Sequence, residues 1–135
     1  MTCISLSSPP LLLYERRMPI QLFRRAAPFL FWAALLFAYV CAIMPAQEAP
    51  KFSSSDKVEH MVAFLTLAIL AAFAFPKATV LKVGIWLAVF GAFIEFSQAV
   101  PALHRDASVY DWVADVAAIC VGLLIVRPLR RIGSA

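Results

Sequence analysis

The chain has 135 residues, of which 63% are hydrophobic and 15% charged, with a formal net charge of +4 and a mean hydropathy of +0.85. A soluble globular domain has roughly 45–50% apolar and about 25% charged residues, so this composition excludes that class and indicates a one-domain membrane protein. Cys3, Cys41 and Cys120 show neither a metal-binding spacing nor an even-numbered disulfide framework, and we interpret Cys41 and Cys120 as packing residues in apolar runs.

Residues 1–25 are polar and irregular, and we expect a largely unstructured segment there; because the part before Met18 has no periodic pattern, Met18 is an alternative start. The first apolar run, Ala26–Met44, is long enough at about 1.5 Å per residue to cross a hydrocarbon core of roughly 30 Å. The run exceeds the roughly 7–15 apolar residues of a signal peptide, and no clean small-x-small cleavage site follows. We therefore interpret it as a retained helix.

Three further apolar runs predict three further membrane-spanning helices, at about residues 58–75, 78–100 and 109–126. Pro76, Pro101 and Pro128 mark their ends, because proline disfavours helix at the residue before it. The serines that precede Asp56 offer an N-cap for the second helix. The sequence thus predicts an all-α, integral membrane four-helix bundle over residues 26–127, with a short C-terminal tail at 128–135.

The distribution of charge predicts the orientation, because lysine and arginine near span ends mark the cytoplasmic side. With both termini inside, nine basic residues and one acid are cytoplasmic (+8), whereas three basic residues and seven acids lie outside (−4). We therefore expect an N-in, C-in protein of a bacterial cytoplasmic membrane. The basic surplus is explained by topology and by attraction to anionic lipids, so we expect no nucleic-acid partner.

Polar side chains gather at the predicted outer ends of the last three helices. Residues three or four apart share a helix face, and the four helix ends of a bundle lie within reach of one another. The sequence therefore predicts an outward-facing polar pocket in which Lys57 and Arg105 neutralise some of the carboxylates. The candidate ligand-binding residues are Asp56, Lys57, His60, Glu95, Gln98, Arg105, Asp111 and Asp115.

Each candidate also has an ordinary structural explanation. Asp56 is placed to cap the second helix, Glu59 to lie solvated in its first turn, and Gln98 to form a hydrogen bond between helices. Glu95 and Asp115 are harder to explain in this way, because a carboxylate in an apolar run needs a partner or a bound proton. Whether Asp115 is charged stays open at this point.

A catalytic role is also left open, with His60, Glu95 and Asp115 as the candidates for proton transfer. The sequence has no nucleophile motif, no Gly-rich phosphate loop and no metal motif such as His-Glu-x-x-His, so we predict no cofactor and no metal.

The pattern resembles the VanZ-like family of small membrane proteins over roughly residues 55 to 126. The matching pieces are Asp56-Lys57-x-x-His60-x-x-x-Phe64, Glu95-x-x-Gln98, Arg105, and Asp111-x-x-x-Asp115 leading to Gly122. The chain departs from the family pattern where many members have Asn at Asp115 and Gly near Ala118. The resemblance implies the fold and the site positions, and it connects the chain with antibiotic resistance through one teicoplanin-resistance member only.

The sequence leaves two functions from different classes. In the first, the protein would bind or act on a cell-envelope lipid or lipid-linked precursor, one with an anionic group that Lys57 and Arg105 would hold. Alternatively, the polar residues only fix helix packing or bind a partner protein. A transporter is less favoured, because the polar groups lie at one end of the spans rather than at mid-membrane. The oligomeric state stays open.

Overall fold

The computed structural model describes residues 11–132 apart from 46, 52, 54 and 104, and this part of the chain is almost entirely helical. It contains α1 (Leu11–Ile43), α2 (Asp56–Ala74), α3 (Val80–Gln98), the short 3₁₀ helix η1 (Pro101–Leu103) and α4 (Val109–Ile132). No strand occurs among the described residues. The predicted all-α four-helix bundle is therefore confirmed.

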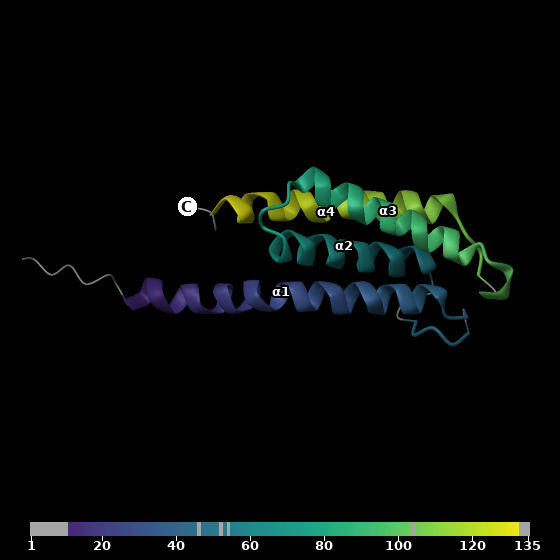
Figure 1. Cartoon of the computed structure of the whole chain (residues 1–135), viewed down its shortest axis with the longest axis horizontal. Coiled ribbons are helices and arrows are strands. Elements are labelled where there is room, and N and C mark those ends of the chain that lie inside the picture. Colours follow the sequence, from purple (N-terminus) through teal and green to yellow (C-terminus); the bar gives the residue numbers. More distant parts are fainter. Residues whose placement is uncertain (1–10, 46, 52, 54, 104, 133–135) are drawn as a thin grey trace, which may run out of the picture.

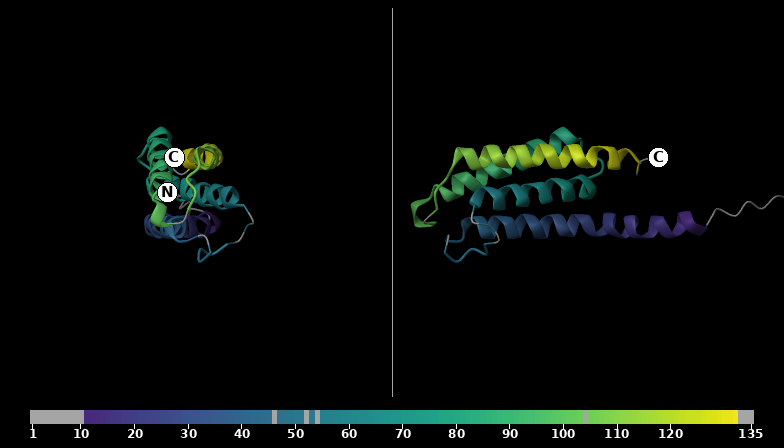
Figure 2. Two further views of the ribbon diagram at one scale, coloured as in Figure 1. Left: turned by 90° about the vertical axis from the view of Figure 1, so that its right-hand side faces the viewer. Right: turned by 180° about the vertical axis from the view of Figure 1, so that it is seen from behind.

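The four long helices run up and down alternately (Figure 1). The connection between α2 and α3 lies at the end where α4 finishes, and the other two connections lie at the opposite end (Figures 1 and 2). We call this opposite end the two-loop end, formed by the connections 44–55 and 99–108. α2 packs against the other three helices, most extensively against α4. An even number of spans thus brings α1 and α4 to the same side at the two chain ends.

All four long helices contain a stretch that is long and apolar enough to cross a membrane, namely Arg25–Ile43, Asp56–Ala74, Val80–Gln98 and Val109–Pro128. No more than 33% of any of these stretches is buried inside the bundle. Large apolar side chains such as Phe29, Leu81, Trp86 and Phe96 face outward instead, with exposed fractions above 70%. An apolar outer surface of this extent is what a lipid-facing bundle needs, so the fold supports a multi-pass membrane protein.

Two helices extend beyond their predicted limits. α1 begins at Leu11, so the prediction that residues 11–25 lack structure was wrong, whereas residues 1–10 lie outside the described part. Once a long apolar helix is formed, each preceding residue adds a hydrogen bond without a new nucleation step. α4 continues to Ile132 rather than ending at Val126. Pro128 has no N–H to donate to the carbonyl of Leu124 and its ring crowds that carbonyl, but the helix continues past it.

α2 and α4 approach each other closely around Gly122. A Cβ atom at Gly122 would lie 2.9 Å from Ala68 Cβ and 3.2 Å from the carbonyl oxygen of Leu65. Ala68 is fully buried, and Ile119 and Leu123 pack into the same core. Small residues at a contact of this kind let two backbones approach, which is how membrane helices gain packing energy.

We expect Gly122→Ala to destabilise the bundle, because the new methyl group meets backbone and a buried alanine that cannot move aside. Overpacking of this kind costs about 1–3 kcal/mol. The measurement is the unfolding midpoint in detergent micelles. Gly84→Ala is the matched control, because its methyl group would meet only the flexible end of Leu123, at 3.3 Å. Equal effects of the two substitutions would contradict the assigned contact.

Candidate functional site

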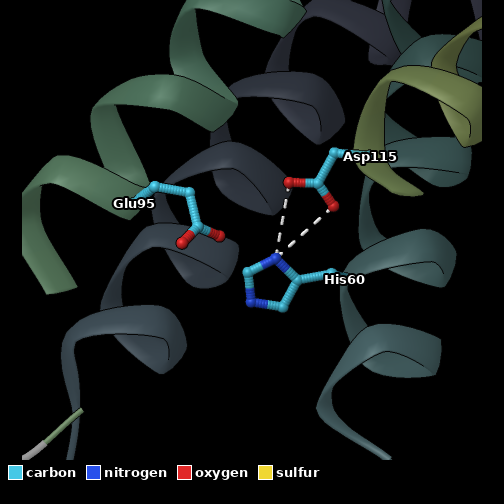
Figure 3. A group of neighbouring side chains, drawn as sticks. All are labelled: His60, Glu95 and Asp115. Carbon is cyan, nitrogen blue, oxygen red and sulfur yellow. Dashed lines mark hydrogen bonds and ion pairs between the residues drawn. The ribbon is translucent and has the colours of Figure 1, made fainter. Parts of the chain in front are cut away.

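Three of the predicted site residues come together from three different helices. His60 lies on α2, Glu95 on α3 and Asp115 on α4, and their side chains point toward one another (Figure 3). The Nδ1 atom of His60 lies 3.4 Å from each of the two carboxylate oxygens of Asp115. One ligand atom from each of the three side chains lies within 4.8 Å of the other two. We call these three residues the polar cluster.

The polar cluster lies slightly below the two-loop end of the bundle. His60 is four residues from the start of α2, Glu95 is three from the end of α3, and Asp115 is six from the start of α4. At about 1.5 Å per residue these positions lie roughly 4–9 Å inside the helix ends. The cluster is therefore placed within the apolar spans but close to one surface, as the sequence predicted.

Asp115 is the most deeply buried member, with an exposed fraction of 0%, and the His60 side chain is 14% exposed. The bundle makes room for this carboxylate at Gly91 of α3. A Cβ atom there would lie 3.3 Å from Asp115 Oδ2 and 3.3 Å from the Phe64 ring. Gly91 thus lets α3 approach the carboxylate closely.

Glu95 is oriented by the connection between α3 and α4. Its Oε2 atom accepts a hydrogen bond from the backbone N–H of Ser108 at 2.7 Å. Ser108 directly precedes α4, and its carbonyl accepts the N–H groups of Asp111 and Trp112. In a capping box the acid three residues after such a serine would accept this N–H group. Here Glu95 of α3 takes that role, so the start of α4 is fixed to α3.

Three buried carboxylate oxygens have no hydrogen-bond partner among the described residues: Glu95 Oε1, Asp111 Oδ1 and Asp115 Oδ1. Asp111 Oδ1 lies 4.0 Å from Lys57 Nζ, which is a long ion pair with a lysine side chain that is 56% exposed. Asp115 Oδ1 faces His60 without hydrogen-bond geometry. Buried acceptors of this kind are unfavourable, so the site has more acceptor oxygens than its neighbours satisfy.

Arg105 does not neutralise a carboxylate, in contrast to the prediction. Its Nε donates to the carbonyl of Met44 at 2.7 Å, and its Nη2 donates to the carbonyl of Cys41 at 2.9 Å. The ion pairs among the described residues are Lys57–Asp111 and His60–Asp115, and Arg105 takes part in neither of them. The last carbonyls of a helix have no partner within the helix, and a guanidinium group satisfies two of them at once. Arg105 therefore caps the C-terminus of α1.

Gln98 makes a similar contact, because its Nε2 donates to the carbonyl of Ala42 at 2.9 Å. Its side chain is buried, with an exposed fraction of 4%. The predicted hydrogen bond between helices is thus present, and it ties α3 to the end of α1. Gln98 and Arg105 together hold α1 against the rest of the bundle at the two-loop end.

The remaining candidates lie at the rim. Asp56 is exposed and is the first residue of α2, where Ser55 is the N-cap, so Asp56 is not the cap. The backbone N–H of Ser53 donates to Glu59 at 3.0 Å. Lys57 Nζ lies 5.5 Å from the centre of the Tyr110 ring, besides its contact with Asp111. His104, which the sequence also places in this region, lies outside the described residues.

A pocket of about 300 Å³ lies beside the polar cluster, and residues of α1 and α2 form most of its wall. His60 is the cluster residue that reaches this pocket. Asp56, Glu59 and Arg105 also line it, and they belong to the two-loop end. The other lining side chains are apolar or small, namely Ala34, Phe37, Ala38, Cys41, Ala42, Ala49, Pro50, Val62, Ala63, Phe64, Thr66, Leu67 and Ile94. The pocket is therefore polar at one end and apolar along its length.

Sequence reasoning missed three residues that shape the site: Gly91, Ser108 and Trp112. The Nε1 of Trp112 donates to the carbonyl of Ala88 at 2.9 Å and joins α4 to α3. Ser108 was detectable, because a serine followed by an acid three residues later is typical of a helix start. The need for glycine at position 91 has no local signal, since it arises from Asp115 on another helix.

No family model matches the chain, and no curated protein or solved structure is significantly similar to it. The resemblance to the VanZ-like family therefore stays a prediction from the residues.

We expect Arg105→Ala to destabilise the protein, because two carbonyls at the end of α1 lose a charged donor. Hydrogen bonds to charged groups contribute about 1.5–3 kcal/mol, and water would replace part of this at the rim. Arg105→Lys should restore less than half of the loss, since an ammonium group lacks the planar two-pronged geometry. The measurement is again the unfolding midpoint, with the exposed Arg127→Ala as control. Full stability of Arg105→Lys would show that the two-carbonyl contact is not needed.

Proposed function

We propose that this protein binds an amphipathic cell-envelope lipid, or a lipid-linked envelope precursor, in the pocket between α1 and α2. The observation that carries the proposal is the division of this pocket into an apolar length and a polar end with Asp56, Glu59, His60 and Arg105. A lipid has the same division. Its tail would lie along the apolar wall, and its headgroup would lie at the two-loop end.

The size and the position of the pocket support this choice. About 300 Å³ is at the lower end of the range for small-molecule sites, so the pocket would hold a headgroup and the first part of a chain rather than a whole lipid. The wall-forming helices carry exposed apolar side chains, including Phe37 and Val62, which themselves line the pocket. A chain that leaves the pocket would therefore continue along a lipid-facing surface.

Two basic residues, Lys57 and Arg105, lie near the polar end of the pocket, where the headgroup would bind. Arg105 is held by two carbonyls of α1, whereas Lys57 is more than half exposed and makes one long ion pair. Of the two cations that were predicted to hold an anionic group, Arg105 lines the pocket and Lys57 does not, so Lys57 would reach a phosphate or carboxylate only from the rim. The proposal concerns binding. His60, Glu95 and Asp115 remain the candidates for proton transfer in a version with turnover.

The orientation is part of the same proposal. The excess of lysine and arginine near the chain ends and near the α2–α3 connection favours an inside position for that end. The two-loop end, with the pocket and the polar cluster, would then face the outer side of a bacterial cytoplasmic membrane.

A structural function is the alternative, and specific contacts favour it. The bonds of Gln98 and Trp112 each join two helices through a backbone carbonyl, and Arg105 joins the α3–α4 connection to the end of α1. The contact between the side chains of His60 and Asp115 joins α2 to α4. On this alternative the polar groups fix helix packing, or prepare the surface for a partner protein, and the pocket has no ligand.

We expect Ala63→Phe to reduce bound lipid several-fold, because Ala63 lines the pocket and the larger side chain fills it. The measurement is the amount of lipid per chain after purification in mild detergent, by extraction and mass spectrometry. Ala92→Phe is the matched control, because Ala92 is exposed on α3 and does not line the pocket. Lipid retained by a well-folded Ala63→Phe variant would favour the structural alternative.

The proposed orientation predicts which loops react from outside. In a background with the three cysteines replaced, Glu48→Cys should react with a membrane-impermeant maleimide added to intact cells, and Lys77→Cys should react only after the membrane is opened. Both positions are exposed, in the α1–α2 and α2–α3 connections respectively. The reverse pattern of labelling would overturn the orientation and place the pocket inside.

A further inference from the structure

We propose that His60, Glu95 and Asp115 bind a divalent transition-metal ion, with Zn²⁺ as the probe that tests the site. The three residue types are ordinary metal ligands, and they come from three helices rather than from one contiguous motif. One ligand atom from each lies within 4.8 Å of the others. This proposal does not depend on lipid binding, because neither Glu95 nor Asp115 lines the pocket.

Unpartnered buried atoms are the second, independent observation. Asp115 is fully buried, and its Oδ1 atom has no hydrogen-bond partner among the described residues. Glu95 Oε1 is also inaccessible to solvent and without such a partner. The carboxyl groups of Glu95 and Asp115 both point toward the region beside the His60 ring (Figure 3). Native structures rarely leave buried acceptors unsatisfied. A bound ion that accepts these lone pairs is one explanation for such atoms.

The charges of the polar cluster also favour a divalent cation. When both acids are deprotonated they carry two negative charges, and a protonated His60 would balance only one of them. A divalent ion with a neutral imidazole balances both, and it makes the group neutral as a whole. Neutrality matters here because the group lies within apolar spans, where an uncompensated charge is costly. Lys57, the nearby cation, has its long ion pair with Asp111 instead.

The distances need only a small adjustment. Zn²⁺ forms bonds of roughly 2.0–2.2 Å to imidazole nitrogen and carboxylate oxygen, so tetrahedral ligand atoms lie about 3.3–3.5 Å apart. His60 Nδ1 is already 3.4 Å from the oxygens of Asp115. Since the third ligand atom lies within 4.8 Å, the Glu95 side chain would move by no more than roughly 1.5 Å. Its Oε2 stays oriented by the N–H of Ser108, as outer contacts orient metal ligands elsewhere.

The ligand set suggests the class of ion and the type of site. One nitrogen and two oxygens suit Zn²⁺, Mn²⁺ or Fe²⁺ better than Cu⁺, which prefers sulfur, or Ca²⁺, which takes six to eight oxygens. Three protein ligands leave a fourth position open, as in catalytic rather than structural zinc sites. His60 is the one proposed ligand that also lines the pocket.

The test is metal binding by the full chain, purified in detergent and stripped with a chelator. We expect about one Zn²⁺ per chain by competition with a fluorescent indicator, together with a higher unfolding midpoint when Zn²⁺ is present. Glu95→Gln and Asp115→Asn should each weaken binding by at least ~10-fold and remove the stabilisation. Asp106→Asn is the control, because Asp106 is an exposed acid at the same end and should leave both readouts unchanged.

A spectroscopic readout covers the case in which a carboxamide variant fails to fold. Cu²⁺ added to the unaltered protein should show electron-paramagnetic coupling to one imidazole nitrogen, and His60→Gln should abolish it. Equal Zn²⁺ affinity in Glu95→Gln, Asp115→Asn and the unaltered chain would mean that the binding is adventitious. Absence of saturable binding in the unaltered chain would likewise overturn the proposal, whatever the lipid measurements show.

Discussion

The contact between His60 and Asp115 is the constraint on which the other features depend. A carboxylate with no exposed surface is tolerated inside an apolar bundle only if polar groups surround it, and His60 supplies the nearest one. The contact requires α2 and α4 to lie close together, which Gly122 and Ala68 permit farther along the same pair of helices. Gly91 then admits the carboxylate beside α3. The packing of three helices is thus adapted to one buried charge.

The fold was largely predictable because the length and the apolarity of a span are local properties of the sequence. Four apolar runs were sufficient to count the helices and to place most of their ends within two residues. The errors lie at the start of α1 and at the end of α4, where the helix extends beyond its apolar run. Pro128 was expected to end α4, but the helix continues past it to Ile132 with one hydrogen bond fewer. Residues 11–25 lack a span-like pattern, yet they extend a helix that already exists.

The candidate site was predictable as a set of residues and not as a set of contacts. Alternating spans bring the ends of α2, α3 and α4 together, so charge position along each helix was sufficient to find His60, Glu95 and Asp115. The partners of Arg105 and Glu95 are backbone groups, namely carbonyls of α1 and the N–H of Ser108. Every residue carries these groups, so a search for opposite charges does not detect them. The assignment of Arg105 to a carboxylate was wrong for this reason.

The pocket and the polar cluster meet at His60, and this shared residue connects the two proposals without making either depend on the other. α1 forms a wall of the pocket but supplies no member of the cluster, and it is held at its C-terminus by Gln98 and Arg105. A headgroup in the pocket would approach the imidazole from the side away from the buried core, whereas Asp115 holds Nδ1 from within the bundle. A ligand that contacts His60 must therefore either use the remaining ring nitrogen or compete with a buried carboxylate. A headgroup that took the second course would leave the Asp115 carboxyl group without its partner, so headgroups that leave the contact intact are favoured, whereas a metal ion would replace the contact with bonds to both residues.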